Sequence, residues 1–191
     1  MAYYVRKIAR SKWALLNQQS EDILGNYKAD TIANDIRTTN NTISLWKTED
    51  LTEENMEPLI VVNSLLGDTI SKMELLIIPE DLLEDFSLQQ EDGNTIVSRY
   101  RSAHYNVEHL TVNKHIQFAR DVVLNIVKSE NEKPNKPSDE KLIIRIRDKD
   151  QLPLIYKWAS QNEFSYGELK SKQKEMLDKY IEKEGLRPLA Y

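Results

Sequence analysis

The chain lacks cysteine entirely and has only five glycines among its 191 residues. The absence of cysteine excludes disulfide bonds, thiol nucleophiles and cysteine-based zinc sites. It also suits a reducing compartment, so we expect a cytoplasmic protein. With so few glycines the chain has little material for a phosphate-cradling loop, and no P-loop, G-x-G-x-x-G or G-x-S-x-G motif is present.

Long apolar runs are also missing. The longest, Leu59–Val62 and Leu75–Ile78, are far shorter than the roughly 18 unbroken apolar residues of a membrane span. Residues 1–13 carry charges without an apolar stretch, which is not the pattern of a signal peptide. With 40% hydrophobic and 30% charged residues, the composition is that of a soluble globular protein, and we expect no membrane association.

Positive charge is nearly absent from one quarter of the chain. Residues 48–95 contain 13 Asp and Glu but one basic residue, Lys72, so this block has a net charge of −12. The whole chain is only −5, and the remaining 143 residues therefore sum to +7. Helix N-termini favour Asp and Glu, which explains about half of these acids. That preference does not explain the lack of Lys and Arg, so we expect an acidic binding surface.

The acidic block suggests a partner-binding site. A short acidic segment follows Pro79, and we predict that Glu80, Asp81, Glu84 and Asp85 contact the partner. Such a surface docks on a basic protein surface or mimics nucleic acid in a nuclease groove. A chain of net charge −5 is a poor general nucleic-acid binder, so any contact with nucleic acid is expected to be weak or indirect.

Strand and helix patterns alternate along the chain. Apolar patterns predict strands over 3–8, 42–47, 72–78 and 141–147, and the stretch 95–101, which fits either type, is assigned as a strand. Helical spacing predicts helices over 29–37, 56–66, 112–128, 150–160 and 166–184, with a short acidic helix after Pro79. The prediction is an α+β fold, with a mixed or antiparallel sheet of four to five strands and four to six helices.

Some patterns also predict how these elements pack. Leu75–Ile78 are consecutive, so both faces of their strand should be covered. Thr111 should cap the helix that follows it, and the core-facing stripe of that helix is expected to be Val112, Ile116, Ala119, Val123 and Ile126. Ser165 and Glu168 have capping-box spacing and should open the helix that Gly185 ends.

The domain organisation follows from one polar stretch. Residues 129–140 lack apolar side chains apart from Pro134 and Pro137, so we expect an exposed linker or loop there. Residues 1–128 would then form the main α+β domain. Residues 141–191 would supply a strand and two helices packed on the same core.

A second hypothesis rests on four arginines. Arg99 and Arg101 share strand spacing, as do Arg145 and Arg147, and the four would meet on one sheet surface if both stretches were strands. Arginine binds phosphate and carboxylate bidentately, so this surface would bind an anion or nucleic acid. The ordinary alternative is a solvated strand face paired with nearby acids.

The three histidines, His104, His109 and His115, lie within 12 residues of one another, with Glu108 between them. The order H-x-x-x-E-H does not match known helical zinc motifs, and on a helix His104 and His109 would be about 140° apart. We therefore expect structural or surface histidines. The alternative is a metal or acid–base role for His104 and His109.

Two segments carry a resemblance to a known group of proteins. Residues 1–13, MAYYVRKIARSKW, and residues 29–46, ADTIANDIRTTNNTISLW, resemble small accessory proteins encoded beside bacterial phage-defence genes. The resemblance lies within the first quarter of the chain and includes no catalytic motif. It implies an accessory subunit that works with a larger nuclease or ATPase.

These observations favour a non-enzymatic accessory or adaptor subunit that binds a larger protein through an acidic surface, within a bacterial antiviral defence complex. The alternative is a nucleic-acid-binding or nuclease-like protein that uses the four arginines and the histidines. We expect no catalytic residue, no metal site and no cofactor.

Overall fold

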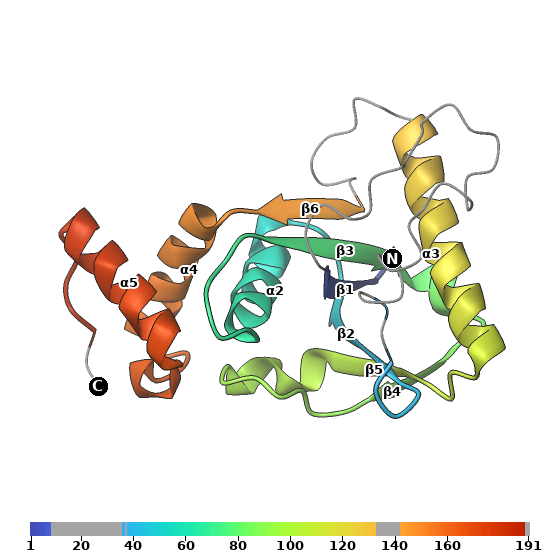
Figure 1. Ribbon diagram of the computed structural model, residues 1–191, viewed down its shortest axis with the longest axis horizontal. Coiled ribbons are helices and arrows are strands. Elements are labelled where there is room, and N and C mark those ends of the chain that lie inside the picture. The colour runs from blue at the N-terminus through green and yellow to red at the C-terminus, as the bar shows by residue number, and fades with distance from the viewer. Residues whose placement is uncertain (9–35, 37, 133–141, 190–191) are drawn as a thin grey trace.

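The computed structural model describes residues 1–8, 36, 38–132 and 142–189, with side chains described up to residue 126 in the helix that ends at residue 132 (Figure 1). The expected helix over 29–37 lies outside the described residues, apart from residue 36. The expected α+β fold is confirmed. The strands form one antiparallel sheet, and helices cover both of its faces.

The sheet has six strands in the order β4-β5-β2-β1-β3-β6. Their bounds are β1 Tyr3–Ile8, β2 Ile43–Thr48, β3 Met73–Pro79, β4 Ser87–Gln90, β5 His104–Glu108 and β6 Ile143–Ile146. Every adjacent pair is antiparallel. The two additional strands are β4, whose sequence Ser-Leu-Gln-Gln has no apolar alternation, and β5, in which only Tyr105 and Val107 alternate with polar residues. The strand expected over 95–101 is wrong, because that stretch enters the 3-10 helix η3, Ser98–Ala103.

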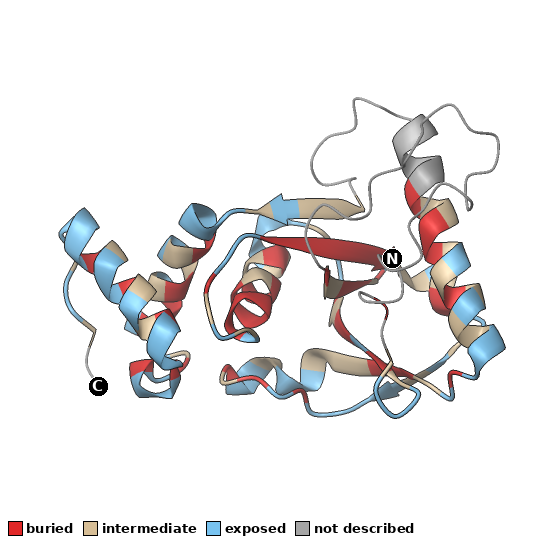
Figure 2. Ribbon diagram, in the orientation of Figure 1, coloured by how far each residue is buried: buried red, intermediate tan, exposed pale blue. Residues whose placement is uncertain are grey.

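Strand β3 lies inside the sheet, between β1 and β6. All six residues from Met73 to Ile78 are buried, which confirms the prediction that both faces of this strand are covered. Side chains on one face enter the cluster that contains Val5 and Trp46, and those on the other face enter the cluster that contains Tyr4 and Leu45. The sheet therefore separates two hydrophobic cores (Figure 2).

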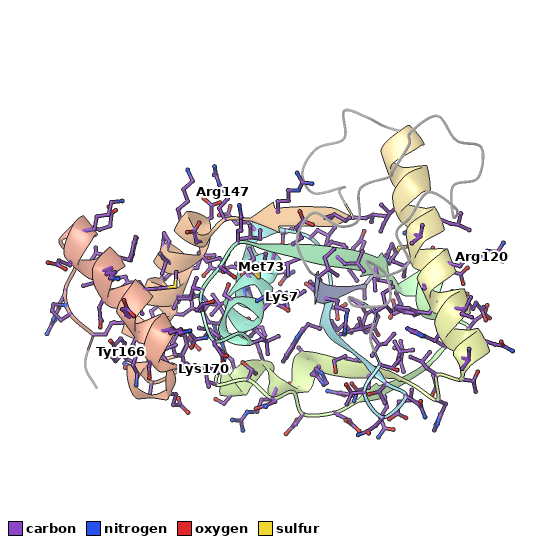
Figure 3. All side chains as sticks on the ribbon, viewed as in Figure 1. Lys7, Met73, Arg120, Arg147, Tyr166 and Lys170 are labelled. Atoms are coloured by element: carbon purple, nitrogen blue, oxygen red, sulfur yellow. The ribbon has the colours of Figure 1, made fainter. Side chains whose placement is uncertain are left out.

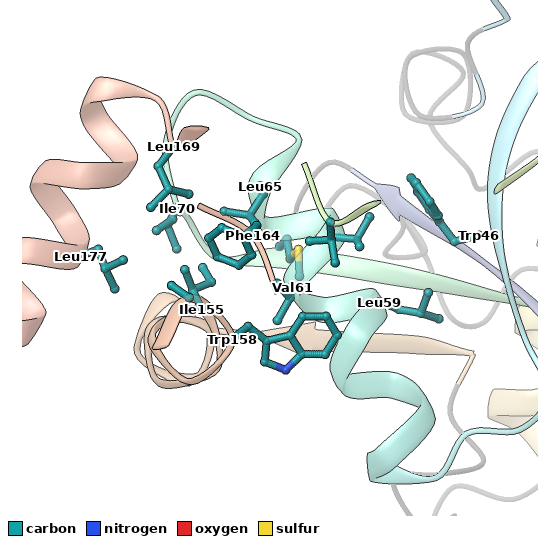
Figure 4. Packing of buried hydrophobic residues seen from close by; sticks show 14 of the residues in the cluster. Trp46, Leu59, Val61, Leu65, Ile70, Ile155, Trp158, Phe164, Leu169 and Leu177 are labelled. Atoms are coloured by element: carbon teal, nitrogen blue, oxygen red, sulfur yellow. The ribbon is translucent and has the colours of Figure 1, made fainter. Parts of the chain in front are cut away.

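The first core lies between the sheet and helices α2 (Glu53–Leu65), α4 (Asp148–Ser160) and α5 (Ser171–Glu184). Trp46 and Trp158 are both buried in it, together with Leu59, Ile155 and Leu177 (Figure 4). Residues beyond 141 therefore share a core with the N-terminal strands. Helix α2 begins three residues before the expected start, and the Asp50 carboxylate fixes this end by accepting hydrogen bonds from the backbone N–H of Thr52, which precedes the helix, and from the side-chain amide of Asn55 in its first turn.

The second core lies under helix α3, Val112–Glu132. The Thr111 hydroxyl accepts a hydrogen bond from the Lys114 backbone N–H at 3.3 Å, as expected of a cap. The expected core stripe is wrong at its start, since Val112 is 75% exposed and Ile116 is 61% exposed. Phe118 sets the buried side instead, with its ring packed edge-on against Phe86. At 100° per residue, Ile116 points about 160° away from Phe118.

The C-terminal helix is interrupted where a continuous helix was expected. The Ser165–Glu168 capping box is present, but it opens only the 3-10 helix η5, Tyr166–Glu168. Leu169 is buried in an extended conformation, and α5 starts afresh after Lys170. Gly185 ends α5 with a left-handed φ of 61°, as predicted. In the stretch 129–140, the first four residues continue α3 and the rest lie outside the described residues.

Candidate functional site

Strands β2 and β3 run in the same direction and end at the same end of the sheet. Tyr3, the first residue of β1, pairs with Thr48 at the end of β2 and with Pro79 at the end of β3. Because β1 lies between the two strands, their ends are about 10 Å apart, which is twice the spacing of neighbouring strands.

Strand β4 ends at this same end of the sheet. Its last residue, Gln90, pairs with Tyr105, and the next residue along, Glu91, donates its N–H to the carbonyl oxygen of His104. His104 in turn pairs with Trp46 near the end of β2. The ends of β4 and β2 are therefore separated sideways only by β5, by about 10 Å, and because Tyr105 also pairs with Leu45, β4 ends three residues, or about 10 Å, short of the end of β2.

The same dipeptide follows each of these three strand ends. We define the acidic rim as these three Glu-Asp pairs: Glu49 and Asp50 after β2, Glu80 and Asp81 after β3, and Glu91 and Asp92 after β4. All are exposed except Glu80, which is half-buried. Glu53 and Glu54 extend the rim into the first turn of α2. Acids that are dispersed over 44 positions of sequence thus converge at one end of the sheet.

Lys47 forms the only salt bridge to the rim among the described residues, with its Nζ 3.5 Å from Glu80. The Nζ also lies 5.9 Å from the ring centre of Tyr4 and 5.8 Å from that of Tyr105. Burial would lower the pKa of Lys47, but Tyr4, Glu80 and Glu49 outweigh this and raise it. Lys47 therefore stays protonated and holds the end of β2 beside the end of β3.

The rim carboxylates differ in how they are held. One Asp50 oxygen accepts hydrogen bonds from the Thr52 hydroxyl, the Thr52 backbone N–H and the Asn55 amide, which together lower the pKa of Asp50. Glu91 accepts a hydrogen bond from the Asn106 amide at 2.6 Å. Glu49, Asp81 and Asp92 make no side-chain hydrogen bond or salt bridge within the described part of the chain. The rim thus presents carboxylates to solvent.

Three acids of the 48–95 block lie elsewhere and are neutralised internally. They pair with basic residues of the C-terminal segment: Glu57 with Lys157 at 2.7 Å, Asp68 with Lys170 at 2.9 Å, and Glu74 with Arg145 at 2.8 Å. Burial would raise the pKa of Glu57, but hydrogen bonds from Lys157 and Trp158 outweigh this and lower it. Glu57 and Glu74, with 17% and 5% of their side chains exposed, are thus engaged within the fold, whereas Asp68 makes its ion pair at the surface.

The four acids predicted from the sequence lie along one crossing segment. Glu80 and Asp81 belong to the rim and to the 3-10 helix η2, Glu80–Leu83, which the buried side chain of Leu83 anchors. Glu84 and Asp85 are exposed after η2, where Lys114 of α3 donates to the Asp85 carbonyl oxygen at 3.0 Å. The predicted set therefore extends from the rim to the first turn of α3.

The four arginines of the second hypothesis do not share a sheet face. Arg99 and Arg101 lie on η3, and β6 contributes only Arg145. Arg99 pairs with Glu163 at 2.9 Å and lies over the rings of Tyr100 and Trp158. Arg101 donates to the Thr95 carbonyl oxygen, Arg145 pairs with the buried Glu74, and Arg147 pairs with Asp150.

The two arginine pairs are also well separated. Arg147 lies at the N-terminal end of α4 (Figure 3). Arg99 lies over the ring of Trp158, which belongs to the last turn of the same helix. Eleven residues of helix place these ends about 16 Å apart. Asp148 and Asp150 occupy the N-terminal turn of α4, where they would repel a phosphate. The geometry therefore gives little support to a joint anion site.

The histidines are dispersed as well. His104 opens β5, where burial lowers its pKa and its ring packs edge-on against Trp46 at 5.0 Å. His109 follows β5, is largely exposed and adopts a positive φ of 54°. His115 on α3 contacts the carbonyl oxygen of Ile36 through Nε2 at 2.7 Å. Within the described ranges, no three His, Asp or Glu side chains are placed to hold a metal ion.

Sequence reasoning found the acidic block but missed its arrangement. The usable signal was the Glu-Asp dipeptide, which recurs in the acidic block at positions 49, 80, 84 and 91. Its meaning depends on the register of β4 and β5, and neither strand was predicted. Without those strands, the pair at 91 and 92 could not be placed beside the pairs at 49–50 and 80–81.

In the part of the chain that the structure describes, no helix has both the length and the apolar character that a membrane span requires. Comparison of the chain with family models, with curated proteins and with solved structures finds no match.

Proposed function

We propose that this protein is a non-enzymatic accessory subunit that binds a positively charged surface of a larger protein through the acidic rim. The observation that carries the proposal is the convergence of three Glu-Asp pairs, from three separate strand ends, at one end of the sheet. Only Lys47 offsets them through a salt bridge among the described residues.

The spacing of the rim favours a macromolecular partner over a small cation. Neighbouring strand ends are about 10 Å or more apart, which is too far for one ion to bridge and suits a surface with several basic side chains. The backbone of each pair is fixed by a strand end, so little ordering is needed on binding. The negative field should accelerate encounter with a basic partner, and added salt should slow it.

The partner and its setting are part of the same proposal. The resemblance of residues 1–13 and 29–46 to accessory proteins encoded beside phage-defence genes supports a nuclease or ATPase as the larger subunit. Both work on nucleic acid or nucleotides and carry basic grooves, which an acidic rim complements. The absence of cysteine supports a cytoplasmic location.

The first test is to isolate the tagged chain from its native host and to identify the protein that is retained with it. Binding kinetics of that protein are then measured for the rim variant Glu49→Lys/Asp81→Lys/Asp92→Lys. Its matched control carries the same charge change on the exposed side of α5, as Glu175→Lys/Glu182→Lys/Glu184→Lys.

The rim variant should lower the association rate by about tenfold or more, as expected when a steering charge is reversed, and the control should stay within about twofold. Raising the salt to about 0.5 M should slow association of the unmodified protein. Equal rates for the two variants, with no response to salt, would reject the rim as the binding surface.

A further inference from the structure

Strand β4 forms one edge of the sheet, since it pairs only with β5. In an antiparallel ladder, residue pairs that are hydrogen-bonded to each other alternate with pairs that are not. Because Glu91 donates its N–H to the carbonyl oxygen of His104 on β5, the backbone groups of Gln89 and Ser87 also point toward β5. The backbone N–H and C=O groups of Leu88 and Gln90 therefore point outward. No hydrogen bond to these groups is present among the described residues.

Apart from its length of four residues, this edge lacks the usual devices that block strand addition. Proline, an inward-pointing charge and a β-bulge are the common protections, and Ser-Leu-Gln-Gln has neither proline nor charge. The side chains of Ser87, Gln89 and Gln90 are exposed, and that of Leu88 is half-buried against the second core. An extended segment thus finds these outward backbone groups unpaired among the described residues.

Negative charge brackets the edge at both ends. Glu84 and Asp85 precede β4, and Glu91 and Asp92 follow it directly. The five residues between the two pairs span about 20 Å of extended chain from Asp85 to Glu91. A segment that pairs with Leu88 and Gln90 would therefore meet carboxylates on both sides of an uncharged centre.

We propose that β4 receives an extended segment of the basic partner as an additional antiparallel strand, with lysine or arginine pairs on both sides of an uncharged core of about five residues. The outward groups of Leu88 and Gln90 provide main-chain hydrogen bonds, and the two acidic pairs set the register. This inference rests on the proposed function and names the form of the segment that the partner presents.

Charge decides between a basic partner and a second copy of this chain. Antiparallel pairing of two β4 edges would place the Glu84–Asp85 pair of one copy against the Glu91–Asp92 pair of the other. Four carboxylates would then face each other at both ends of the new ladder, which is destabilising. A basic segment converts the same positions into ion pairs.

The experiment uses the full chain and an acetylated, amidated nonapeptide, Lys-Lys-Thr-Val-Thr-Val-Thr-Lys-Lys, as the probe. Affinity is measured by calorimetry for Gln90→Pro and for its matched control, Gln90→Ala. Proline removes an N–H that points away from β5, so the β4–β5 ladder is retained. Alanine keeps this N–H. Both variants lose the side-chain hydrogen bond from Gln90 to the Ser102 carbonyl oxygen, so this loss is the same in the two.

Gln90→Ala should bind the peptide within about twofold of the unmodified chain, and Gln90→Pro should bind at least tenfold more weakly at similar thermal stability. Hydrogen exchange at the amides of Leu88 and Gln90 should slow when the peptide is added. Replacing the peptide lysines with glutamine, or changing Glu84→Gln/Asp85→Asn, should also weaken binding.

Equal affinity of the two Gln90 variants, or unchanged exchange at Leu88, would overturn strand addition at β4. The proposed function would survive that result, because its test uses the host partner and variants that leave β4 intact. Self-association that Gln90→Pro abolishes would assign the edge to a second copy and would also overturn the inference.

Discussion

Gly93 is a single residue on which the third acidic pair depends. It is buried where the loop after β4 crosses Trp46 and His104, and its N–H donates to the Arg101 carbonyl oxygen. A Cβ at this position would overlap the Trp46 ring and would lie 2.8 Å from the Cβ of His104. Only glycine lets the loop lie this close, and the loop carries Glu91 and Asp92.

Gly93→Ala is therefore expected to lower the free energy of unfolding by about 1–3 kcal/mol, because the core beneath the loop is overpacked. Denaturant unfolding measures this loss. The same substitution at Gly67 is the control, since the nearest atom to a Cβ there is 3.4 Å away, and it should be neutral or slightly stabilising. Equal stability of the two variants would contradict the close contact at Gly93.

At the scale of the element, helix α2 ends without a glycine cap. Its last carbonyl groups are satisfied by side chains that come from distant parts of the chain. Lys7 of β1 donates to Asn63, Lys170 donates to Leu66, and Gln173 donates to both Leu65 and Gly67. Burial lowers the pKa of Lys7, and its ammonium group lies where the negative end of the helix dipole favours it. The end of α2 is thus fixed by β1 and α5 together.

Gln173 carries the largest share of this cap, since it is buried and bonds two carbonyl groups. We expect Gln173→Met to cost roughly 2–3 kcal/mol of unfolding free energy, because the side-chain volume is kept while two buried acceptors lose their donor. Thermal and urea unfolding would show the loss. Lys172→Met, on the exposed side of the same helix, should change stability by less than about 0.5 kcal/mol. Similar effects of the two substitutions would show that the cap contributes little.

Elements with strong apolar patterns were predictable from the sequence, and elements defined by tertiary contacts were not. β1, β2, β3 and β6 each carry alternating or continuous apolar residues, and all four were found. β4 has a single apolar residue, Leu88, and β5 has two, Tyr105 and Val107, in an alternation too short to distinguish it from a loop, and pairs such as Gln89 with Asn106 join the two strands. The stripe of α3 was misplaced because Phe118 was omitted from it, although Phe118 determines which side of the helix is buried.

The candidate site shows the same division. The acidic block could be found by counting charges, because composition does not depend on the fold. Which acids remain free depends on ion pairs between residues that are far apart in the chain. In the pairs formed by Glu57, Asp68, Glu74 and Arg99, the two partners are 64 to 102 positions apart. No local pattern indicates these partners, so Glu57 could not be distinguished from Glu53 before the structure was known.

For the whole molecule, the acids of the 48–95 block divide into two groups with opposite roles. Glu57, Asp68 and Glu74 bind cations of the C-terminal segment, and Arg99 binds Glu163 of that segment in return. These pairs join residues 142–189 to α2, the loop after it, β3 and η3, in addition to the shared first core. Glu49, Asp81 and Asp92 of the rim make no such pair among the described residues, and they repel the neighbouring rim acids. Neutralising the two groups should therefore change stability in opposite directions.

Glu57→Gln should lower the unfolding free energy by about 1 kcal/mol at neutral pH, because the Lys157 ion pair is lost while an acceptor for Trp158 remains. The rim variant Glu49→Gln/Asp81→Asn/Asp92→Asn should be unchanged or more stable, since repulsion is relieved.

The folded-state pKa of Glu57 lies below its ordinary value of 4.5, so the contribution of Glu57 to stability is complete above pH 4.5 and is lost as pH falls through the folded pKa. The difference between the unmodified chain and Glu57→Gln, followed by urea unfolding across this range, should close on acidification. A deficit that persists after Glu57 is protonated would mean that the substitution acts through packing, and destabilisation by the rim variant would mean that the rim serves the fold.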